Sequence, residues 1–410
     1  MTQQLQDAYV VAAVRTPIGK APRGMFRNTR PDDLLIHAVR AALAKVPALD
    51  PATIDDMIVG CSFPEGEQGL NVARVAALLA GLPSSVAGAT VNRFCASGLT
   101  AVQIAADRIR TGEAEVMIAA GVESMSMVPM GGGKPSFNPA IFAGAGENAA
   151  IAWGMGLTAE KVAQQWKVSR EDQDAFAVES HRRAIAAIAS GGFADEIAPF
   201  EIAETFARLG TAETEVRRRL AGVDEGPRAD TSLEALARLR PAFAAPKDPS
   251  GRATGFGSVT AGNSSQTSDG AGALVLVNEA TLKRFGLVPL ARWAGFAVRG
   301  VPPEVMGIGP KVAIPAVLER AGVALGDVGW IELNEAFAAQ SLAVIRELGL
   351  DPVKVNPNGG AIALGHPLGA TGAIRSATAI HGMRRTGARY SMVTMCIGTG
   401  MGAAGLFEAV

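Results

Sequence analysis

Cys95 stands where a cysteine could act as a nucleophile. It follows a predicted strand and precedes a predicted helix over 97–111, so its sulfur would meet the free N–H groups and partial positive charge of a helix start. That setting favours the thiolate, which is the form that attacks carbonyl carbons. Ser97 and Gly98 are small and would let a substrate reach the sulfur. From this motif alone, a purely structural thiol is the alternative.

His366 is the histidine whose surroundings suit a general base. It lies within Asn358–Gly372, a stretch with five glycines that predicts a tight loop at a helix start. A general base needs a fixed imidazole beside an open space, and such a loop can supply both. His37, His181 and His381 lie in Ala-rich helical patterns that are typical of packing or surface positions.

Two further segments could place polar groups beside a reacting carbonyl. The run from Cys396 to Gly402 follows a predicted strand, and its glycines, Gly398 among them, expose N–H groups that can form an oxyanion hole. Asn334 also follows a predicted strand, where it could orient a water or a carbonyl, or be a turn residue. Ligands bind at the carboxyl ends of strands in α/β sheets, so we expect these groups to converge there.

The elements that must position these groups alternate between strand and helix. This alternation predicts α/β layers around a largely buried sheet. In the first half, the predicted strands are 9–14, 56–60, 89–92 and 115–119, and the predicted helices are 33–46, 71–80 and 97–111. In the second half, the predicted strands are 329–333 and 391–395, and the predicted helices are 312–321 and 370–385.

The two halves resemble each other in sequence at one constant offset. Ile54–Phe63 aligns with Val328–Phe337 (328 − 54 = 274), and Ala96–Gly98 aligns with Ala370–Gly372 (372 − 98 = 274). Both alignments fall at matching points of the strand–helix order. The pattern therefore predicts a duplicated pair of α/β halves.

A segment of different character separates the halves. We expect residues 1–124 with 258–277 to form the first half, 278–410 the second, and 125–257 an inserted loop domain with helices such as 169–190. Within it, Glu204 to Arg219 ends in three arginines. This stretch is predicted to be a solvated helix face, with a phosphate-binding patch as the alternative.

Composition and charge argue against several classes of protein. The net charge is −1, so there is no electrostatic case for binding nucleic acid or a membrane surface. Three unevenly spaced cysteines argue against a disulfide framework and against a metal site. No apolar run reaches the ~18 residues of a membrane helix, and neither terminus has a targeting signal, so a cytoplasmic protein is expected.

Four motifs, taken together, resemble those of the thiolase family. They are Asn92–Gly98 (NRFCASG), Asn334–Phe337 (NEAF), Gly365–Gly372 (GHPLGATG) and Cys396–Gly402 (CIGTGMG), in this order. The resemblance covers nearly the whole chain and includes Arg15–Gly19 (RTPIG) near its start. It implies an α/β thiolase fold, in which two duplicated halves form a layered αβαβα core, and a CoA-dependent acyltransferase.

The resemblance also implies a ping-pong reaction through a thioester. 3-Ketoacyl-CoA is cleaved with CoA to acetyl-CoA and a shortened acyl-CoA, or formed by the reverse Claisen condensation. Cys95 resembles the acylated nucleophile, His366 the base that activates it, and Cys396 the acid/base at the substrate α-carbon. Asn334 resembles the residue whose water, with His366, binds the thioester oxygen. The N–H groups of Cys95 and Gly398 resemble a second oxyanion hole.

Contacts with CoA follow from the same resemblance. CoA would be a co-substrate, and no tightly bound cofactor or metal is expected. Ser265 matches the family serine near the pantetheine, and Arg228 matches a residue near the adenine. Met155, Met306 and Phe337 match apolar residues that line the thioester channel.

Departures from the family pattern concern the type of thiolase. Gly154 stands where biosynthetic members usually carry His, and Ser264–Gln266 looks more like the degradative 3-ketoacyl-CoA thiolases, which implies fatty acid β-oxidation. The stretch 204–222 has no close counterpart in the family, and an insert at 247–257 lengthens a connection. Both leave the acyl chain length open.

Three other activities and two assemblies stay open at this point. The alternatives are an acetoacetyl-CoA-forming biosynthetic thiolase, a ketoacyl synthase and a non-catalytic acyl-CoA-binding relative. A ketoacyl synthase would carry a second His in place of Asn334 and would lack Cys396, and a binding relative would have lost a catalytic residue. The family suggests a homodimer or a homotetramer.

Overall fold

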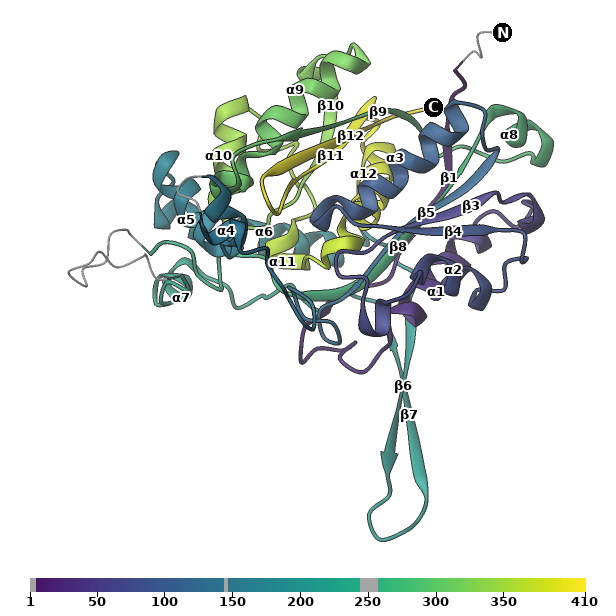
Figure 1. Ribbon diagram of the computed structural model, residues 1–410, viewed down its shortest axis with the longest axis horizontal. Coiled ribbons are helices and arrows are strands. Elements are labelled where there is room, and N and C mark those ends of the chain that lie inside the picture. Colours follow the sequence, from purple (N-terminus) through teal and green to yellow (C-terminus); the bar gives the residue numbers. More distant parts are fainter. Residues whose placement is uncertain (1–4, 144–146, 244–256) are drawn as a thin grey trace.

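Two α/β halves of the same design make up most of the molecule (Figure 1). The computed structural model describes residues 5–143, 147–243 and 257–410. The first half contains β1 (Tyr9–Arg15), β2 (Gly19–Lys20), α1 (Pro31–Ala44), β3 (Asp56–Gly60), α2 (Val72–Leu79), β4 (Ala87–Val91), α3 (Ser97–Arg110), β5 (Val116–Ser124), β8 (Ser268–Val277) and α8 (Glu279–Phe285). The second half contains β9 (Ala291–Gly300), α9 (Pro310–Ala321), β10 (Val328–Leu333), α10 (Ala338–Leu348), α11 (Ala361–Leu364), α12 (Leu368–Thr386), β11 (Tyr390–Ile397) and β12 (Met401–Glu408).

The strand order is the same in both halves, as the duplication predicts. The first half has the order β4–β3–β5–β8–β1, in which β3 is parallel to β4 and β5 while β8 and β1 are antiparallel. The second half has the order β10–β11–β12–β9, again with a parallel pair followed by antiparallel strands. Val355 pairs in parallel with Ile331 of β10, in the place that β4 holds in the first half. The halves are joined by a short antiparallel pairing of β1 with β9.

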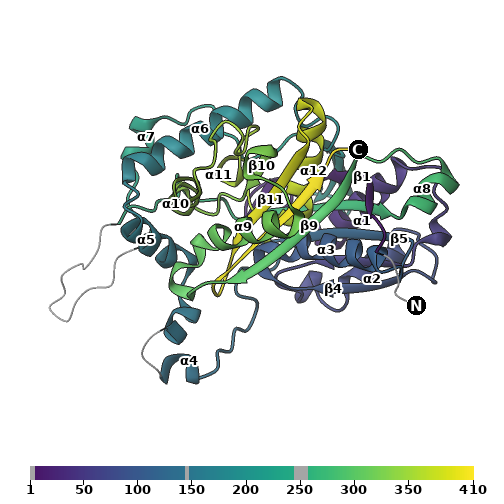
Figure 2. The same cartoon turned by 90° about the horizontal axis from the view of Figure 1, so that it is seen from above.

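Five layers follow from where the buried side chains gather. One apolar cluster lies between α1, α2 and the first half of the sheet, and another lies between α9, α10 and the second half. A third cluster joins side chains of both halves to α3 and α12, which lie between them. Figures 1 and 2 show this arrangement, with the first half in purple and blue, apart from the teal-green β8 and α8, and the second half in green and yellow. The predicted αβαβα layering is confirmed.

The central helices α3 and α12 approach each other through glycines. A Cβ atom on Gly98 would lie 2.7 Å from the backbone N of Ala373, and one on Gly372 would overlap the backbone N of Leu99. The contact therefore permits no side chain at either position. α12 is buried from Leu368 to Met383, which explains why its sequence is rich in Ala, Gly, Ser and Thr rather than amphipathic.

The segment between β5 and β8 carries further helices and a β-hairpin. Ser169 caps the predicted helix over 169–190 by accepting a hydrogen bond from the N–H of Asp172 at 3.0 Å. The predicted insert 247–257 lies outside the described residues, except for Gly257. The elements of this segment are α4 (Ala140–Ala143), α5 (Met155–Gln165), α6 (Arg170–Ala189), β6 (Phe200–Ala207), β7 (Thr214–Ala221) and α7 (Leu233–Ala237).

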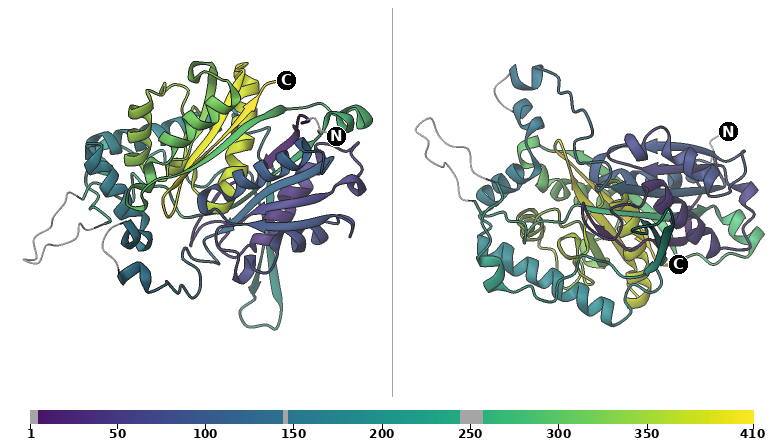
Figure 3. Two further views of the ribbon diagram at one scale, coloured as in Figure 1. Left: turned by 45° about the horizontal axis from the view of Figure 1, so that its top comes forward. Right: turned by 90° about the horizontal axis from the view of Figure 1, so that it is seen from below.

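The predicted helix over 204–219 is wrong, because this stretch belongs to the hairpin β6–β7 (Figures 1 and 3). Its Glu, Ala and Arg residues have high helix propensity, but cross-strand pairing decides the structure. Ile202 and Ala221 anchor the base of the hairpin in the core of the first half. Arg218 pairs with Glu201 across the strands at 2.5 Å. The hairpin projects from the body of the molecule, and most of its side chains are exposed.

The remaining predicted strands and helices of both halves are present, with ends that differ by a few residues. Within the three ranges that the structure describes, no helix is both long enough and apolar enough to cross a membrane.

The glycine contact between the central helices predicts a large loss of stability for Gly372→Ala. The added methyl group has only backbone in front of it and must push α3 and α12 apart, which costs about 1–3 kcal/mol or more. Thermal unfolding followed by circular dichroism measures the effect. Gly326→Ala is the matched control, because among the described residues its Cβ would meet no atom within 4 Å. Equal melting temperatures for the two variants would contradict the contact.

Candidate active site

The turn that carries Cys95 is held by side chains around it. Cys95 lies in a 3₁₀ turn (Phe94–Ala96) between β4 and α3, and it is 9% exposed. Phe94 has φ +44°, a left-handed value that costs a non-glycine residue about 1–3 kcal/mol. The Asn92 side chain accepts a hydrogen bond from the Phe94 N–H at 2.8 Å, and the Ser97 hydroxyl donates to the Phe94 carbonyl at 2.6 Å. These bonds hold the strained turn in place.

Cys95 is a thiol in the resting site. Burial raises its pKa to about 12 and outweighs the N–H groups of Gly398 and of Cys95 itself, which favour the thiolate; the nearby Glu123 raises the pKa further. The prediction that the helix start makes Cys95 a thiolate is therefore wrong for the resting protein. The Gly398 N–H lowers the pKa of the Cys95 thiol, so Gly398 lies close to this sulfur.

Cys396 lies next to Cys95 at the end of β11. It is completely buried, and both burial and the proximity of Cys95 raise the pKa of its thiol. β11 is followed by a turn in which Thr399 and Gly400 have φ +68° and +92°, and which leads directly into β12. This turn holds Gly398 against the ring of Phe94, because a Cβ on Gly398 would be 3.7 Å from that ring. The structure thus brings Cys95, Cys396 and Gly398 together.

His366 is fixed by both ring nitrogens in the loop between α11 and α12. Its Nδ1 lies 2.6 Å from the Thr371 hydroxyl, which itself donates to the Pro367 carbonyl at 3.0 Å. The single proton of the Thr371 hydroxyl is donated to the Pro367 carbonyl, so toward His366 this hydroxyl acts as an acceptor. The neutral ring therefore carries its proton on Nδ1. Nε2 is then an acceptor and lies 3.3 Å from the Asn334 Nδ2. This tautomer is the one a general base requires at Nε2.

His366 is neutral in the resting site. Burial lowers its pKa to about 3, with a further contribution from the positive charge of Arg375 on α12. Asn334 donates its backbone N–H to the Thr394 carbonyl of β11 at 2.9 Å, so its position is set by two neighbouring strands. Its side-chain Oδ1 is buried and has no protein partner among the described residues. That oxygen can accept a hydrogen bond from a ligand or a water.

Apolar side chains surround Cys396. Met155 at the start of α5, Met306 and Phe337 belong to one cluster with this thiol. Phe243 packs edge-on against Phe337, with ring centroids 6.4 Å apart. The structure therefore brings the three predicted channel residues together beside one of the two active-site cysteines.

The two predicted polar contacts for CoA are placed differently. Ser265 donates its backbone N–H to the Ala336 carbonyl at 2.9 Å and so lies beside the NEAF segment. The Arg228 side chain is 61% exposed and lies 3.4 Å from Asp230, while its backbone N–H donates to His181 Nδ1 at 3.1 Å. Ser265 thus lies near the catalytic groups and Arg228 lies on the surface.

Two family models cover this arrangement from end to end. The model described as "Thiolase, N-terminal domain" matches residues 8–280, and "Thiolase, C-terminal domain" matches residues 287–409. The chain belongs to the thiolase family. The predicted family, fold and acyltransferase activity are thereby confirmed.

Individual thiolases are similar over their full lengths. The 3-ketoacyl-CoA thiolase of Bacillus subtilis is 49% identical, with 98% of this chain and 100% of that protein covered. The crystal structure of human mitochondrial 3-ketoacyl-CoA thiolase superposes with a TM-score of 0.86 at 37% identity, covering 99% of each chain. The Bacillus anthracis acetyl-CoA acetyltransferase gives a TM-score of 0.86 at 38% identity, covering 100% of each chain.

Two residues of this thiolase site were missed by reasoning from the sequence. Thr371 orients His366 and stands five residues after it. A hydroxyl in the first turn of the helix that follows His366 could have identified it from the sequence. Glu123 is a buried carboxylate beside the Cys95 turn, and it does not belong to any motif that could be recognised in the sequence.

Thr371→Val should lower turnover because it removes the group that receives the Nδ1 proton. The ring of His366 is then no longer held in the tautomer that leaves Nε2 unprotonated. We expect kcat to fall on the order of 10–10²-fold while KM changes little. Steady-state kinetics of thiolysis measures this. Thr386→Val is the matched control, because Thr386 bonds the carbonyl four residues back on the same helix, at 2.9 Å, but lies at its far end.

The neutral state of His366 predicts its response to pH. A histidine in an unfolded chain takes up a proton near pH 6.5, whereas His366 in the folded protein resists protonation until about pH 3. The stability that this preference contributes is present above pH 6.5 and is lost as the pH falls from there toward 3. The ring carbon signals of His366, assigned by their loss in His366→Asn, should not shift between pH 8 and pH 5. A titration midpoint between pH 6 and 7 would contradict this.

Proposed function

We propose that this thiolase cleaves 3-ketoacyl-CoA with CoA to acetyl-CoA and a shortened acyl-CoA, and that it runs the reverse Claisen condensation by the same route. The observation that carries the proposal is the pair of buried thiols, Cys95 and Cys396, brought together from the two halves. The neutral His366–Asn334 pair supports it. One thiol can carry the acyl group while the other moves a proton.

In the first half-reaction, the Cys95 sulfur bonds to the 3-keto carbon and its proton passes to Nε2 of His366. The bond between C2 and C3 of the substrate then breaks. Its electron pair goes to C2, which takes a proton from Cys396 and leaves as acetyl-CoA. The N–H groups of Cys95 and Gly398 would hold the oxyanion of the tetrahedral intermediate. Asn334, with a water, and His366 would bind the thioester oxygen of the leaving enolate.

In the second half-reaction, CoA gives its thiol proton to Cys396 and attacks the acyl group on Cys95. The thioester passes to CoA, and Cys95 regains its proton from His366. Because burial favours the neutral forms of both Cys95 and His366 in the resting site, we infer that proton transfer accompanies attack on the substrate rather than preceding it.

CoA is proposed as the co-substrate, held by the residues that the family resemblance indicates. Met155, Met306 and Phe337 would line the thioester channel, and their common cluster with Cys396 supports this. Ser265 would lie near the pantetheine and Arg228 near the adenine. The exposure of the Arg228 side chain suits a contact with the outer end of a long ligand.

The physiological role is proposed as degradative, in fatty acid β-oxidation. Gly154, the N-cap residue of α5, replaces the histidine that biosynthetic members usually carry. The 3-ketoacyl-CoA thiolase names of the similar proteins support this assignment. A biosynthetic, acetoacetyl-CoA-forming thiolase is the second candidate, and the similarity to an acetyl-CoA acetyltransferase favours testing it.

Assembly, location and domain limits are further proposals. β4 is an edge strand whose side chains are half-buried, so its unpaired edge could pair with a second copy in a homodimer, or in a homotetramer built from dimers. A cytoplasmic location is retained from the sequence. The proposed units are 1–124 with 258–277, 125–257 and 278–410, supported by the position of β8 between β1 and β5.

The test is consumption of acetoacetyl-CoA and of a longer 3-ketoacyl-CoA when CoA is added. Cleavage that falls at least about 10³-fold in Cys95→Ala supports the proposal. The ratio of the two rates decides between the degradative and biosynthetic candidates. Alkylation of Cys95, mapped by mass spectrometry and prevented by acyl-CoA, is the accompanying control. Failure of the well-folded protein to cleave either substrate would overturn the proposal.

A further inference from the structure

Glu123 is a completely buried carboxylate that the reaction above does not use. It lies near the end of β5. Its Oε2 accepts hydrogen bonds from the N–H groups of Ser62 at 2.8 Å and Gly369 at 2.7 Å. Its Oε1 accepts from the side-chain amide of Gln68 and from the N–H of Phe63 at 3.4 Å. The Cys61 thiol is a fifth donor, 3.9 Å from Oε1. Five donors around one carboxyl group match the ionised form, which only accepts, although burial raises the pKa of Glu123.

The two donors to Oε2 connect Glu123 with the turn that carries Cys95 and with the helix that follows His366. The Ser62 carbonyl accepts from the side-chain amide of Asn92 at 2.9 Å, and Asn92 in turn accepts from the Phe94 N–H in the turn of the nucleophile. Gly369 lies in the first turn of α12, three positions after His366. One carboxylate oxygen therefore connects the nucleophile's turn in the first half with the start of α12 in the second half.

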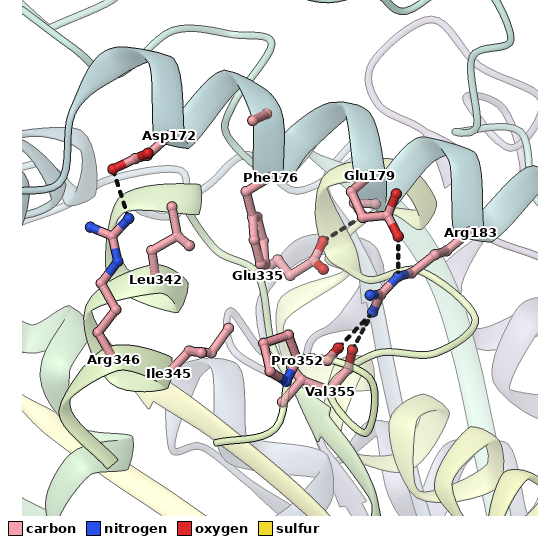
Figure 4. Close-up of a pocket in the computed structure, with 12 residues that line it drawn as sticks. Asp172, Phe176, Glu179, Arg183, Glu335, Leu342, Ile345, Arg346, Pro352 and Val355 are labelled. Atoms are coloured by element: carbon pink, nitrogen blue, oxygen red, sulfur yellow. Dashed lines mark hydrogen bonds and ion pairs between the residues drawn. The ribbon is translucent and has the colours of Figure 1, made fainter. Parts of the chain in front are cut away.

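Glu335 holds the other end of the histidine segment. Its carboxylate accepts from the Ile362 N–H at 3.1 Å, the Ser180 hydroxyl at 2.7 Å and the Asn356 amide at 2.8 Å. Figure 4 shows Glu335 among the residues that line a pocket of about 280 Å³ between α6 and α10. The stretch from 362 to 369 is thus tied at both ends to buried carboxylates, one from each half.

We propose that Glu123 is a positioning residue for thiolysis, which places Cys95 relative to His366 and keeps a negative charge beside the sulfur. The proposal rests on the proposed function. Glu123 touches neither reacting atom and acts through Ser62 and Gly369. Small displacements of catalytic groups cost much in rate, so a carboxylate that ties both segments together has a direct effect on turnover.

The charge of Glu123 favours the resting state of the nucleophile. It raises the pKa of Cys95, in addition to the effect of burial. The other groups that influence the two thiols are the N–H groups of Gly398 and of Cys95 itself, which lower the pKa of Cys95, and Cys95, which raises the pKa of Cys396 on β11. Because an idle thiolate is the form that oxidises, a charge that keeps Cys95 protonated until the substrate arrives also protects it.

Two substitutions distinguish the effect of the charge of Glu123 from the effect of its side-chain length. Glu123→Gln keeps the size, removes the charge and turns an amide N–H₂ toward N–H donors. Glu123→Asp keeps the charge but is one methylene too short to hold Ser62 and Gly369 together. We expect kcat for thiolysis to fall in both on the order of 10–10²-fold, with KM for CoA nearly unchanged. Glu115→Gln, at an exposed position directly before the same strand, is the matched control and should behave as the wild type.

The rate of Cys95 alkylation by iodoacetamide at pH 8 distinguishes positioning from mere loss of packing. Removal of the charge lowers the pKa of Cys95, so Glu123→Gln should be alkylated severalfold faster than Glu123→Asp, although it turns over more slowly than the wild type. Wild-type kcat in a folded Gln or Asp variant, or equal alkylation rates in the two, would overturn the proposal. If the Gln variant fails to fold, the kcat of the Asp variant still decides. An inactive wild type would instead overturn the proposed function.

Discussion

The backbone contact between α3 and α12 is the constraint on which the active site depends. α3 begins two residues after Cys95, and α12 begins two residues after His366, so the start of each helix fixes the position of one proposed catalytic residue. The helices meet through Gly98 and Gly372, close to those starts. Any separation of the helices would therefore move Cys95 relative to His366. The five layers, with apolar clusters on both sides of the central pair, hold that contact in place.

Burial around this contact also sets the chemistry. Cys95, Cys396 and His366 are all buried, and burial favours the neutral form of each. In such a site, charge is costly until a substrate provides an oxyanion for the N–H groups of Cys95 and Gly398 to stabilise. A neutral resting site is therefore consistent with two thiols lying side by side in a protein that must avoid oxidising them.

Reasoning from the sequence predicted the features that depend on local order. Strand–helix alternation predicted the layers, and the positions of Cys95 and His366 just before helices were predicted correctly. The hairpin β6–β7 was mispredicted because its composition favours helix. Its two strands form because the chain turns at Gly210 and pairs with itself in the antiparallel direction. Glu123 was missed because its partners Ser62 and Gly369 lie 61 and 246 positions away in the chain. The thiol form of Cys95 could not be predicted, because it depends on burial by both halves.

The contact between Gly98 and Gly372 relates the two repeated halves to each other by symmetry. These residues occupy equivalent positions in the repeated halves (372 − 98 = 274), so the contact joins a residue to its own copy, as in a twofold dimer of identical subunits. One polypeptide thus contains the kind of contact that a twofold axis produces between identical subunits. The two halves differ at the position of His366, since its counterpart is Asn92 (366 − 274 = 92), whose side chain holds the turn of Cys95. The two halves therefore differ in what they contribute to the site, because the first carries Cys95 and the second carries His366.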